Sequence, residues 1–147
     1  MSVCVDNLTI LVVEDEAIIR LQIATLLESW GHNVLVAEDA AEAMALIDAG
    51  HRPDVALLDI ELGAGQDGVS ISTRLREKWG IPSIFASGNL QNEILMRAIR
   101  TGPLNLLRKP FTETHLRRAL ELAKEALVEA PFEADPSIAS DIWSRPH

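Results

Sequence analysis

The sequence predicts an α/β fold in which one five-stranded parallel sheet is covered by helices on both faces. Short apolar runs of strand length alternate five times with segments whose apolar residues recur every three or four positions. Strands that alternate with helices along a chain form parallel sheets, because each helix carries the chain back across the sheet. A chain of 147 residues is too short for an eight-fold barrel, so we expect an open, doubly wound sheet.

The five predicted strands are apolar and rich in β-branched residues, as is typical of buried strands. They comprise residues 8–13, 33–37, 55–59, 82–86 and 104–107. The third run, Val-Ala-Leu-Leu, leads directly into Asp59. In the flavodoxin-like strand order 2-1-3-4-5, the first and third strands end side by side, and ligands bind at that point.

The five predicted helices each carry one apolar stripe and have recognisable ends. Asp39 and Thr112 are suited to cap the second and fifth helices, and a glycine such as Gly80 follows each of the first four. The residues expected to face the core are Ile19, Ile23, Leu26 and Trp30, then Ala40, Ala43, Met44 and Ile47, then Val69, Ser72, Leu75 and Trp79, then Ile94, Leu95, Ala98 and Ile99, and finally Leu116, Leu120, Ala123 and Leu127.

Composition and charge argue against several classes of protein. Hydrophobic residues make up 48% of the chain, so a disordered protein is not expected. The net charge of −9 argues against a nucleic-acid-binding surface. No apolar run approaches the roughly 20 residues that span a bilayer, and no signal-peptide pattern is present. The single cysteine, Cys4, cannot form an internal disulfide, so we expect a cytoplasmic protein. The four histidines lack metal-ligand spacing and are expected at the surface.

Acidic residues follow the first and third predicted strands. Glu14 and Asp15 come after the first strand, and Asp59 ends the third. Carboxylates gathered in one crevice repel each other unless a cation compensates or their pKa values rise. Oxygen ligands of this kind suit Mg²⁺. We expect Asp15 and Asp59 to be direct ligands, Glu14 to act through water and the backbone carbonyl of Glu61 to complete the set. A solvated acidic turn is the alternative.

Ser87 and Lys109 follow the fourth and fifth predicted strands and belong to the same edge of the sheet. A lysine offers a point charge to phosphate oxygens, and a serine hydroxyl can donate to the same anion. A carboxylate such as Asp59 can itself be a nucleophile and form an aspartyl-phosphate. Such a transfer needs mainly positioning and charge neutralisation. The alternatives are a structural salt bridge between Lys109 and Asp59, and a helix N-cap at Ser87.

Taken in order, these residues resemble the receiver domain of two-component response regulators. The resemblance rests on Glu14-Asp15, Asp59, Ser87 and Lys109-Pro110, and it covers roughly residues 8–129. It implies that a histidine kinase or phosphotransfer protein phosphorylates Asp59 in the presence of Mg²⁺. It also implies that Ser87 moves towards the phosphoryl group, that Lys109 holds it, and that the Lys109–Pro110 peptide is cis. Dimerisation through the fourth helix, fifth strand and fifth helix is a further implication of the family.

The chain departs from the common receiver pattern in the fifth strand. Leu106 stands where receivers usually carry a Tyr or Phe that reorients on activation, and the chain has no tyrosine. Coupling from Ser87 to the output face must therefore differ. The segment Phe85-Ala-Ser-Gly is similar to a receiver subgroup with Phe-Ala-Thr-Gly, although Asn89 stands where that subgroup has an aromatic residue. The subgroup lacks the aromatic switch and often pairs with kinases of the HWE or HisKA2 type.

We expect a receiver domain over residues 1–129 and a C-terminal tail over residues 130–147, which is too short for an output domain. The chain is then a single-domain response regulator, which acts as a protein-binding switch for a downstream protein or as a phosphorelay intermediate, and is not an enzyme. A degenerate receiver that binds partners without phosphorylation is one alternative. An aspartyl-phosphate phosphatase of the haloacid dehalogenase kind is another, although Glu61 is the wrong residue for its general acid. A flavodoxin-like binder of nucleotide or flavin is a third.

Overall fold

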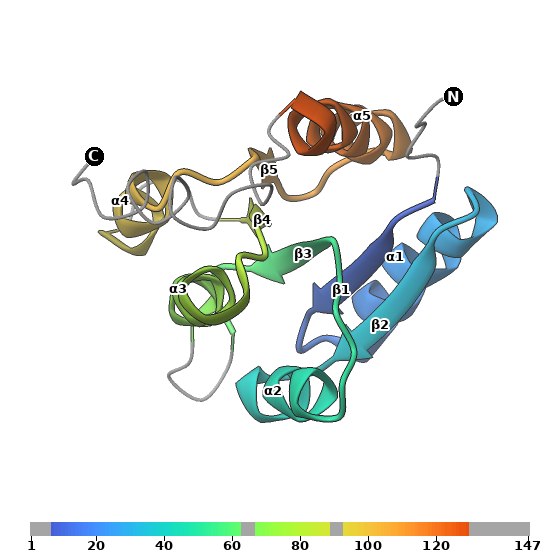
Figure 1. Ribbon diagram of the computed structural model, residues 1–147. Helices are drawn as coiled ribbons and strands as arrows, with labels where there is room; N and C mark the ends of the chain where they lie inside the picture. The colour runs from blue at the N-terminus through green and yellow to red at the C-terminus, as the bar shows by residue number, and fades with distance from the viewer. Residues whose placement is uncertain (1–6, 63–66, 89–92, 130–147) are drawn as a thin grey trace.

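A computed structural model of the chain shows five parallel strands in one sheet with helices on both faces, as predicted (Figure 1). The structure describes residues 7–62, 67–88 and 93–129, so the predicted tail and Asn89 lie outside the described residues. The strands are β1 (Thr9–Val13), β2 (Asn33–Ala37), β3 (Val55–Asp59), β4 (Ser83–Ser87) and β5 (Asn105–Arg108). The helices are α1 (Ala17–Ser29), α2 (Ala40–Asp48), α3 (Gly68–Trp79), α4 (Glu93–Arg100) and α5 (Glu113–Glu129).

The strand order is β2-β1-β3-β4-β5, and every neighbouring pair is parallel. This confirms the predicted order 2-1-3-4-5. Val13 pairs with Leu58, and Asp59 pairs with Ala86. The carboxyl ends of β1, β3 and β4 therefore meet at one edge of the sheet, where the chain reverses its winding.

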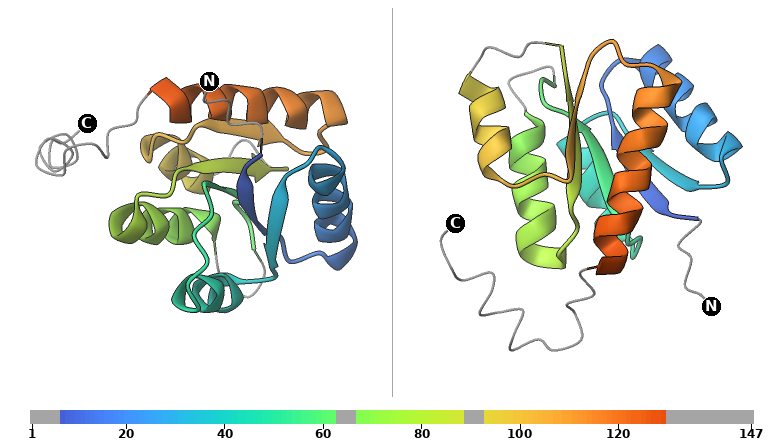
Figure 2. Two further views of the ribbon diagram at one scale, coloured as in Figure 1. Left: turned by 45° about the vertical axis from the view of Figure 1, so that its right-hand side comes forward. Right: turned by 90° about the horizontal axis from the view of Figure 1, so that it is seen from above.

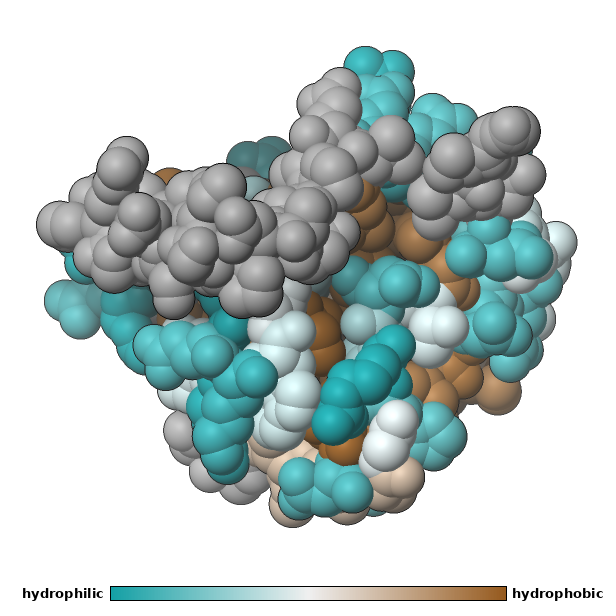
Figure 3. Space-filling model, in the orientation of Figure 1, coloured by the Kyte–Doolittle hydropathy of each residue, from teal (hydrophilic) through white to brown (hydrophobic). Residues whose placement is uncertain are grey.

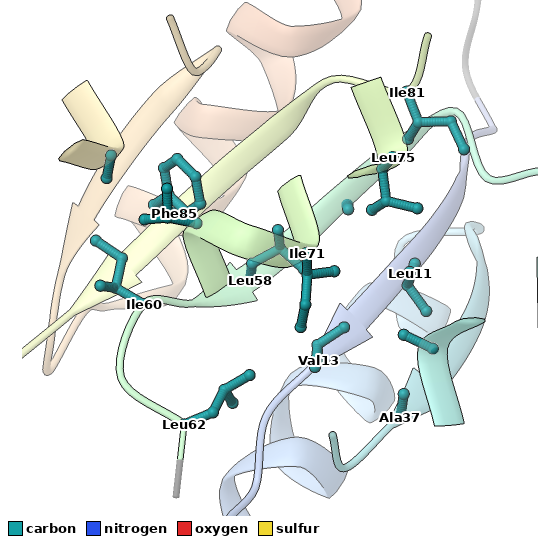
Figure 4. Packing of buried hydrophobic residues seen from close by; sticks show 14 of the residues in the cluster. Leu11, Val13, Ala37, Leu58, Ile60, Leu62, Ile71, Leu75, Ile81 and Phe85 are labelled. Atoms are coloured by element: carbon teal, nitrogen blue, oxygen red, sulfur yellow. The ribbon is translucent and has the colours of Figure 1, made fainter. Parts of the chain in front are cut away.

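The core lies in two layers, one on each face of the sheet. Helices α1 and α5 cover one face, and α2, α3 and α4 cover the other (Figures 1 and 2). Because side chains alternate along a strand, Leu57 packs under α1 and α5, whereas Leu58 packs with α3. Figure 4 shows Leu58 and Ile71 pointing toward one another in the second layer. Every residue of β3 and β4 is buried, which explains their continuous apolar sequences.

The helix ends follow the predicted capping chemistry. The Asp39 carboxylate accepts a hydrogen bond of 2.9 Å from the Glu42 N–H at the start of α2. The Thr112 hydroxyl accepts one of 3.1 Å from the His115 N–H at the start of α5. Gly80 ends α3 with a φ of 67°, a left-handed conformation that residues with a Cβ rarely adopt.

Two sequence-based expectations about burial are wrong. Ile99, expected in the core, is 50% exposed, because α4 turns Leu95 and Ala98 toward the sheet instead. The side chain of Ile94 lies outside the described residues. His32, expected at the surface, is only 6% exposed, and its Nδ1 accepts a hydrogen bond of 3.0 Å from the Leu8 N–H.

The face shown in Figure 3 is largely hydrophilic, with hydrophobic side chains visible between the polar ones near its centre. Among the helices of the described ranges, none combines the length and the apolar character that crossing a membrane requires.

Candidate functional site

The carboxyl edge of the sheet brings the predicted site residues together. Glu14 and Asp15 directly follow β1, and Asp59 is the last residue of β3. Ser87 is the last residue of β4, and Lys109 directly follows β5. Each residue is therefore placed by a strand that neighbouring strands hold in register.

Backbone hydrogen bonds continue the sheet beyond the strand ends and fix this arrangement. The Glu14 N–H donates to the Ala37 carbonyl at 3.1 Å, and the Lys109 N–H donates to the Ser87 carbonyl at 2.8 Å. The Lys109–Pro110 peptide is cis, as the family resemblance implies. The hydrogen bond to the Ser87 carbonyl holds Lys109 against the end of β4.

Lys109 lies between two buried carboxylates. Its Nζ is 2.8 Å from Glu14 Oε1 and 3.1 Å from Asp59 Oδ2. Glu14 is 2% exposed and Asp59 is 7% exposed, whereas the lysine side chain retains 20%. Buried carboxylates are costly unless they are paired, so Lys109 neutralises part of a strong local negative charge. The salt bridge to Asp59 that was expected as one alternative for Lys109 is therefore present.

The second oxygen of each buried carboxylate accepts a backbone hydrogen bond. The Glu61 N–H donates to Asp59 Oδ1 at 3.1 Å, and the Glu16 N–H donates to Glu14 Oε2 at 3.2 Å. Each acid therefore pairs with the Lys109 ammonium through one carboxylate oxygen, and a backbone N–H orients its other oxygen.

A glycine packs against the backbone of Asp59. The Gly68 N–H donates to the Ile60 carbonyl at 2.9 Å, and Glu61 forms an isolated antiparallel bridge with Asp67. A Cβ on Gly68 would clash with the carbonyl oxygen of Asp59. The start of α3 is thus fixed directly to the end of β3, and only glycine fits at this contact.

Burial raises the pKa of Asp59 to about 6. The positive charge of Lys109 lowers this pKa and the nearby Glu14 raises it, so the two neighbours partly offset each other. Burial also acts on Lys109 and would lower the pKa of its ammonium. Its contacts with Glu14 and Asp59 outweigh this effect, so the pKa of Lys109 is raised. At neutral pH, which is above the pKa of about 6, Asp59 is therefore mostly ionised beside a charged Lys109.

The acidic residues form a group that suits a hard cation. Glu14, Asp15 and Asp59 each offer one carboxylate oxygen, and these oxygens lie within 4.8 Å of one another. Asp15 is exposed, so the group opens to solvent on one side. An all-oxygen set with room for water fits Mg²⁺, which binds few protein ligands and keeps part of its hydration shell.

Leu106 lies in β5, where it pairs with Phe85 and packs against the core layer of α2, α3 and α4. It is partly buried, and its N–H donates to the Asn105 side chain at 2.7 Å. An aliphatic side chain fills this position without the polar tip of a tyrosine, so it cannot donate a hydrogen bond from one side of β5 to the other.

A hollow of about 450 Å³ lies beside the lysine. It is lined by residues of α1 and by the segment from Lys109 to Glu113. Ile18 and Leu21 of α1 are 73% and 67% exposed. The sequence alone did not indicate this surface, because the exposed residues share a helix with the core stripe.

Sequence reasoning also missed Asp67 and Arg97, whose side chains form an ion pair of 3.4 Å between the cap of α3 and α4. An aspartate directly before a helix is an N-cap signal, and Asp67 does accept from the Ser70 N–H at 2.8 Å. Its partner on α4 depends on the packing of two helices, which local sequence does not specify.

The fold is a doubly wound sheet with an acidic edge, and at that edge a lysine is paired with a buried aspartate. This combination is typical of receiver-type α/β proteins. The sequence model of the response regulator receiver domain matches residues 10–121, and the chain belongs to this family.

Curated relatives agree with this membership. The chain is 31% identical over 115 residues to the transcriptional regulatory protein PdtaR of Mycobacterium tuberculosis, a match covering 78% of the chain and 55% of PdtaR. It is 31% identical over 115 residues to the phyllosphere-induced regulator PhyR of Methylorubrum extorquens, covering 78% of the chain and 42% of PhyR. The match thus spans about half the length of these relatives.

Solved structures show the same fold. The N-terminal domain of a response regulator/sensory box/GGDEF 3-domain protein from Carboxydothermus hydrogenoformans superimposes with a TM-score of 0.75 at 29% identity, covering 84% of this chain and 98% of that one. The receiver domain of the sensor histidine kinase PA1611 from Pseudomonas aeruginosa gives a TM-score of 0.71 at 26% identity, covering 81% and 98%. That structure has a magnesium ion coordinated in its active site cleft.

Proposed function

We propose that this chain is a response-regulator switch in which Asp59 accepts a phosphoryl group from the phosphohistidine of a histidine kinase or phosphotransfer protein. In this step an oxygen of Asp59 attacks phosphorus and forms an O–P bond, while the P–N bond breaks and its electron pair returns to the imidazole. The observation that carries the proposal is the placement of Lys109 between Asp59 and Glu14, beside an oxygen cluster that opens to solvent.

The residues around Asp59 have distinct proposed roles. The Lys109 ammonium, already 3.1 Å from Asp59, holds the oxygens of the transferred group. The Ser87 hydroxyl donates to the same group. Asp15, Asp59 and the Glu61 carbonyl would hold Mg²⁺ directly, and Glu14 would act through water. Mg²⁺ bound there would supply positive charge for the phosphoryl oxygens, and the magnesium ion in the active site cleft of the PA1611 receiver domain supports a metal in this part of the fold.

The exposed apolar surface of α1 supports a protein as the phosphoryl donor. A donor histidine must approach Asp59 from outside the sheet edge, and the hollow beside Lys109 is adjacent to that approach. Ile18 and Leu21 offer apolar area that a partner helix can bury. Arg20 holds the Glu14 carbonyl at 2.7 Å, so α1 is also fixed to the site itself.

The readout by a downstream protein uses a route without an aromatic side chain at Leu106. Phosphorylation replaces a carboxylate by a larger, more negatively charged group, which shifts the balance between two conformations near β4 and β5. The Phe85-Ala-Ser-Gly segment supports a place in the receiver subgroup that lacks the aromatic switch. A kinase of the HWE or HisKA2 type is the corresponding donor. We assign the receiver unit to residues 1–129, around the matched range 10–121.

Intact-mass measurement after incubation with acetyl phosphate and Mg²⁺ tests this proposal. We expect the wild type to gain the mass of one phosphoryl group, and a chelator to block the gain. Asp59→Asn should gain nothing, while the matched control Asp48→Asn, which changes an exposed acid at the end of α2, should behave as wild type.

Two results would contradict the proposal. If neither acetyl phosphate nor a phosphorylated histidine-containing donor modifies the wild type, the chain is a receiver that binds partners without phosphorylation. If Asp59→Asn gains the same mass as the wild type, the acceptor is another residue.

A further inference from the structure

The described apolar side chains of α4 are divided between the core and the surface. Leu95 and Ala98 are its buried residues among the described side chains, whereas Met96 and Ile99 are 52% and 50% exposed. The helix lies beside α3 on the same face of the sheet (Figure 2). Polar contacts with α3 also hold α4 in place.

The C-terminal end of α4 is fixed to α3 by an arginine. The guanidinium of Arg76 donates to the backbone carbonyls of Thr101 and Gly102, the latter at 3.0 Å. Carbonyls at a helix C-terminus lack partners within the helix, so Arg76 supplies what the end of α4 needs. This contact is remote from Asp59 and anchors one end of α4.

A second polar contact between described residues of α4 and α3 leads toward Asp59. Arg97 Nη1 is 3.4 Å from Asp67 Oδ2, while Asp67 Oδ1 accepts from the Ser70 N–H at 2.8 Å. The two oxygens of Asp67 therefore serve two helices, one as the cap of α3 and the other as the ion-pair partner of α4. The Asp67 side chain is 16% exposed and that of Arg97 is 48% exposed.

Asp67 is in turn connected to the carboxylate of Asp59. Glu61 bridges to Asp67 in the backbone, and the Glu61 N–H donates to Asp59 Oδ1 at 3.1 Å. The next residue, Gly68, packs on the carbonyl of Asp59. A continuous series of contacts thus runs from the Asp59 carboxylate through Glu61 and Asp67 to Arg97.

We propose that Asp67 and Arg97 are positioning residues that couple the state of Asp59 to the position of α4, in place of an aromatic residue at position 106. The inference rests on the proposed function. A phosphoryl group on the Asp59 carboxylate changes the acceptor that the Glu61 N–H meets, and the Glu61–Asp67 bridge carries this change to the cap of α3. The Arg97 contact then shifts α4.

The size of the effect follows from the exposure of the pair. A half-exposed ion pair changes a two-state equilibrium by up to about fivefold. The coupling therefore biases α4 and does not act as an all-or-none lock.

Hydrogen exchange of backbone amides with and without beryllofluoride and Mg²⁺ tests the coupling, because beryllofluoride mimics a phosphoryl group on a carboxylate. In the wild type we expect altered exchange both at Glu61 and Gly68 and along α4. In Asp67→Asn, which keeps a cap oxygen, and in Arg97→Gln, the change at Glu61 and Gly68 persists while that along α4 falls several-fold. Arg100→Gln removes an exposed charge from the same helix and should behave as wild type.

Each remaining outcome contradicts the coupling. An α4 response in Arg97→Gln equal to that of the wild type would show that the ion pair does not carry it. If Arg100→Gln reduces the exchange response of α4 as much as Arg97→Gln does, the cause is a general effect of charge on the helix. A wild type that responds at Glu61 and Gly68 but not in α4 would overturn the coupling alone. No response at Glu61, Gly68 or α4 would overturn the proposed function together with it.

Discussion

Replacing Asp59 with asparagine is expected to stabilise the fold at neutral and alkaline pH. The pKa of Asp59 is about 6 in the folded protein and has an ordinary value of 3.8, so the folded state holds the proton more tightly than the unfolded chain does. A difference of about 2 pKa units corresponds to about 3 kcal/mol. Asparagine resembles the protonated acid in shape and carries no charge, so it removes the free-energy cost of holding an ionised Asp59 in the folded protein.

The pH dependence of the effect fixes its sign. Between the two pKa values the folded protein binds more protons than the unfolded chain, so stability falls as pH rises from about 4 to about 6. The full loss of stability from ionised Asp59 is present above about pH 6, and it is absent below about pH 4. Asp59→Asn should therefore raise the free energy of unfolding by about 3 kcal/mol at about pH 8 and leave it nearly unchanged at about pH 4.

Urea denaturation without metal, repeated across this pH range, measures the difference. Glu125→Gln changes an exposed carboxylate on α5 to an amide and should alter stability by less than about 0.5 kcal/mol at any pH. A variant at position 59 that is no more stable than wild type at about pH 8 would refute the reasoning. So would a stabilisation that does not depend on pH, because burial of a charge could not then be its cause.

Three further changes test other parts of the structure. Lys109→Met leaves two buried acids without their shared cation, and should cost about 3 kcal/mol at about pH 8 and progressively less in acid, by urea denaturation. Gly68→Ala should cost more than about 2 kcal/mol by the same measurement, whereas Gly88→Ala, with its nearest atom at 3.9 Å, should be tolerated. Burial, and to a smaller extent Lys124, lower the pKa of His32, so the stability that neutral His32 contributes is lost as the pH falls below 6.5, the ordinary pKa of histidine. His32→Gln should therefore lose less stability in acid than the wild type does, as measured by thermal unfolding.

The controls for these changes come from the same chain. A loss in Lys109→Met that is equal at both pH values would show that charge is not responsible. Equal effects at Gly68 and Gly88 would contradict the close contact with Asp59. The histidine comparison is made in the Asp59→Asn background, because Asp59 responds to pH in the opposite direction, and His51→Gln, which changes an exposed histidine, should retain the acid sensitivity.

Most of the fold could be predicted because the buried parallel strands leave a clear pattern. In β3 both faces are covered, so the apolar residues are consecutive and the polar Asp59 marks the strand end. Residues that follow parallel strands share one edge, which is why Glu14, Asp15, Ser87 and Lys109 could be grouped with Asp59 from sequence order alone.

The features that could not be predicted depend on how elements pack. The apolar stripe predicted for α4 included Ile99, which is half exposed in the structure. The orientation of the helix on the sheet decides which apolar residues face the core, and the sequence pattern does not specify it. His32 is buried because β1 begins beside the turn that follows α1. The pairing of Arg97 with Asp67 joins residues 30 positions apart, and no local pattern specifies it.

The central claim is that Asp59 is the residue that forms the phosphoryl bond, and reductive trapping tests it most directly. Borohydride converts an acyl phosphate on aspartate to homoserine, and peptide mass mapping then locates the modified residue. After treatment with acetyl phosphate and Mg²⁺, we expect homoserine at position 59 and unmodified acids at positions 14 and 15. Homoserine at another position, or a phosphoryl group that borohydride does not release, would contradict the assignment.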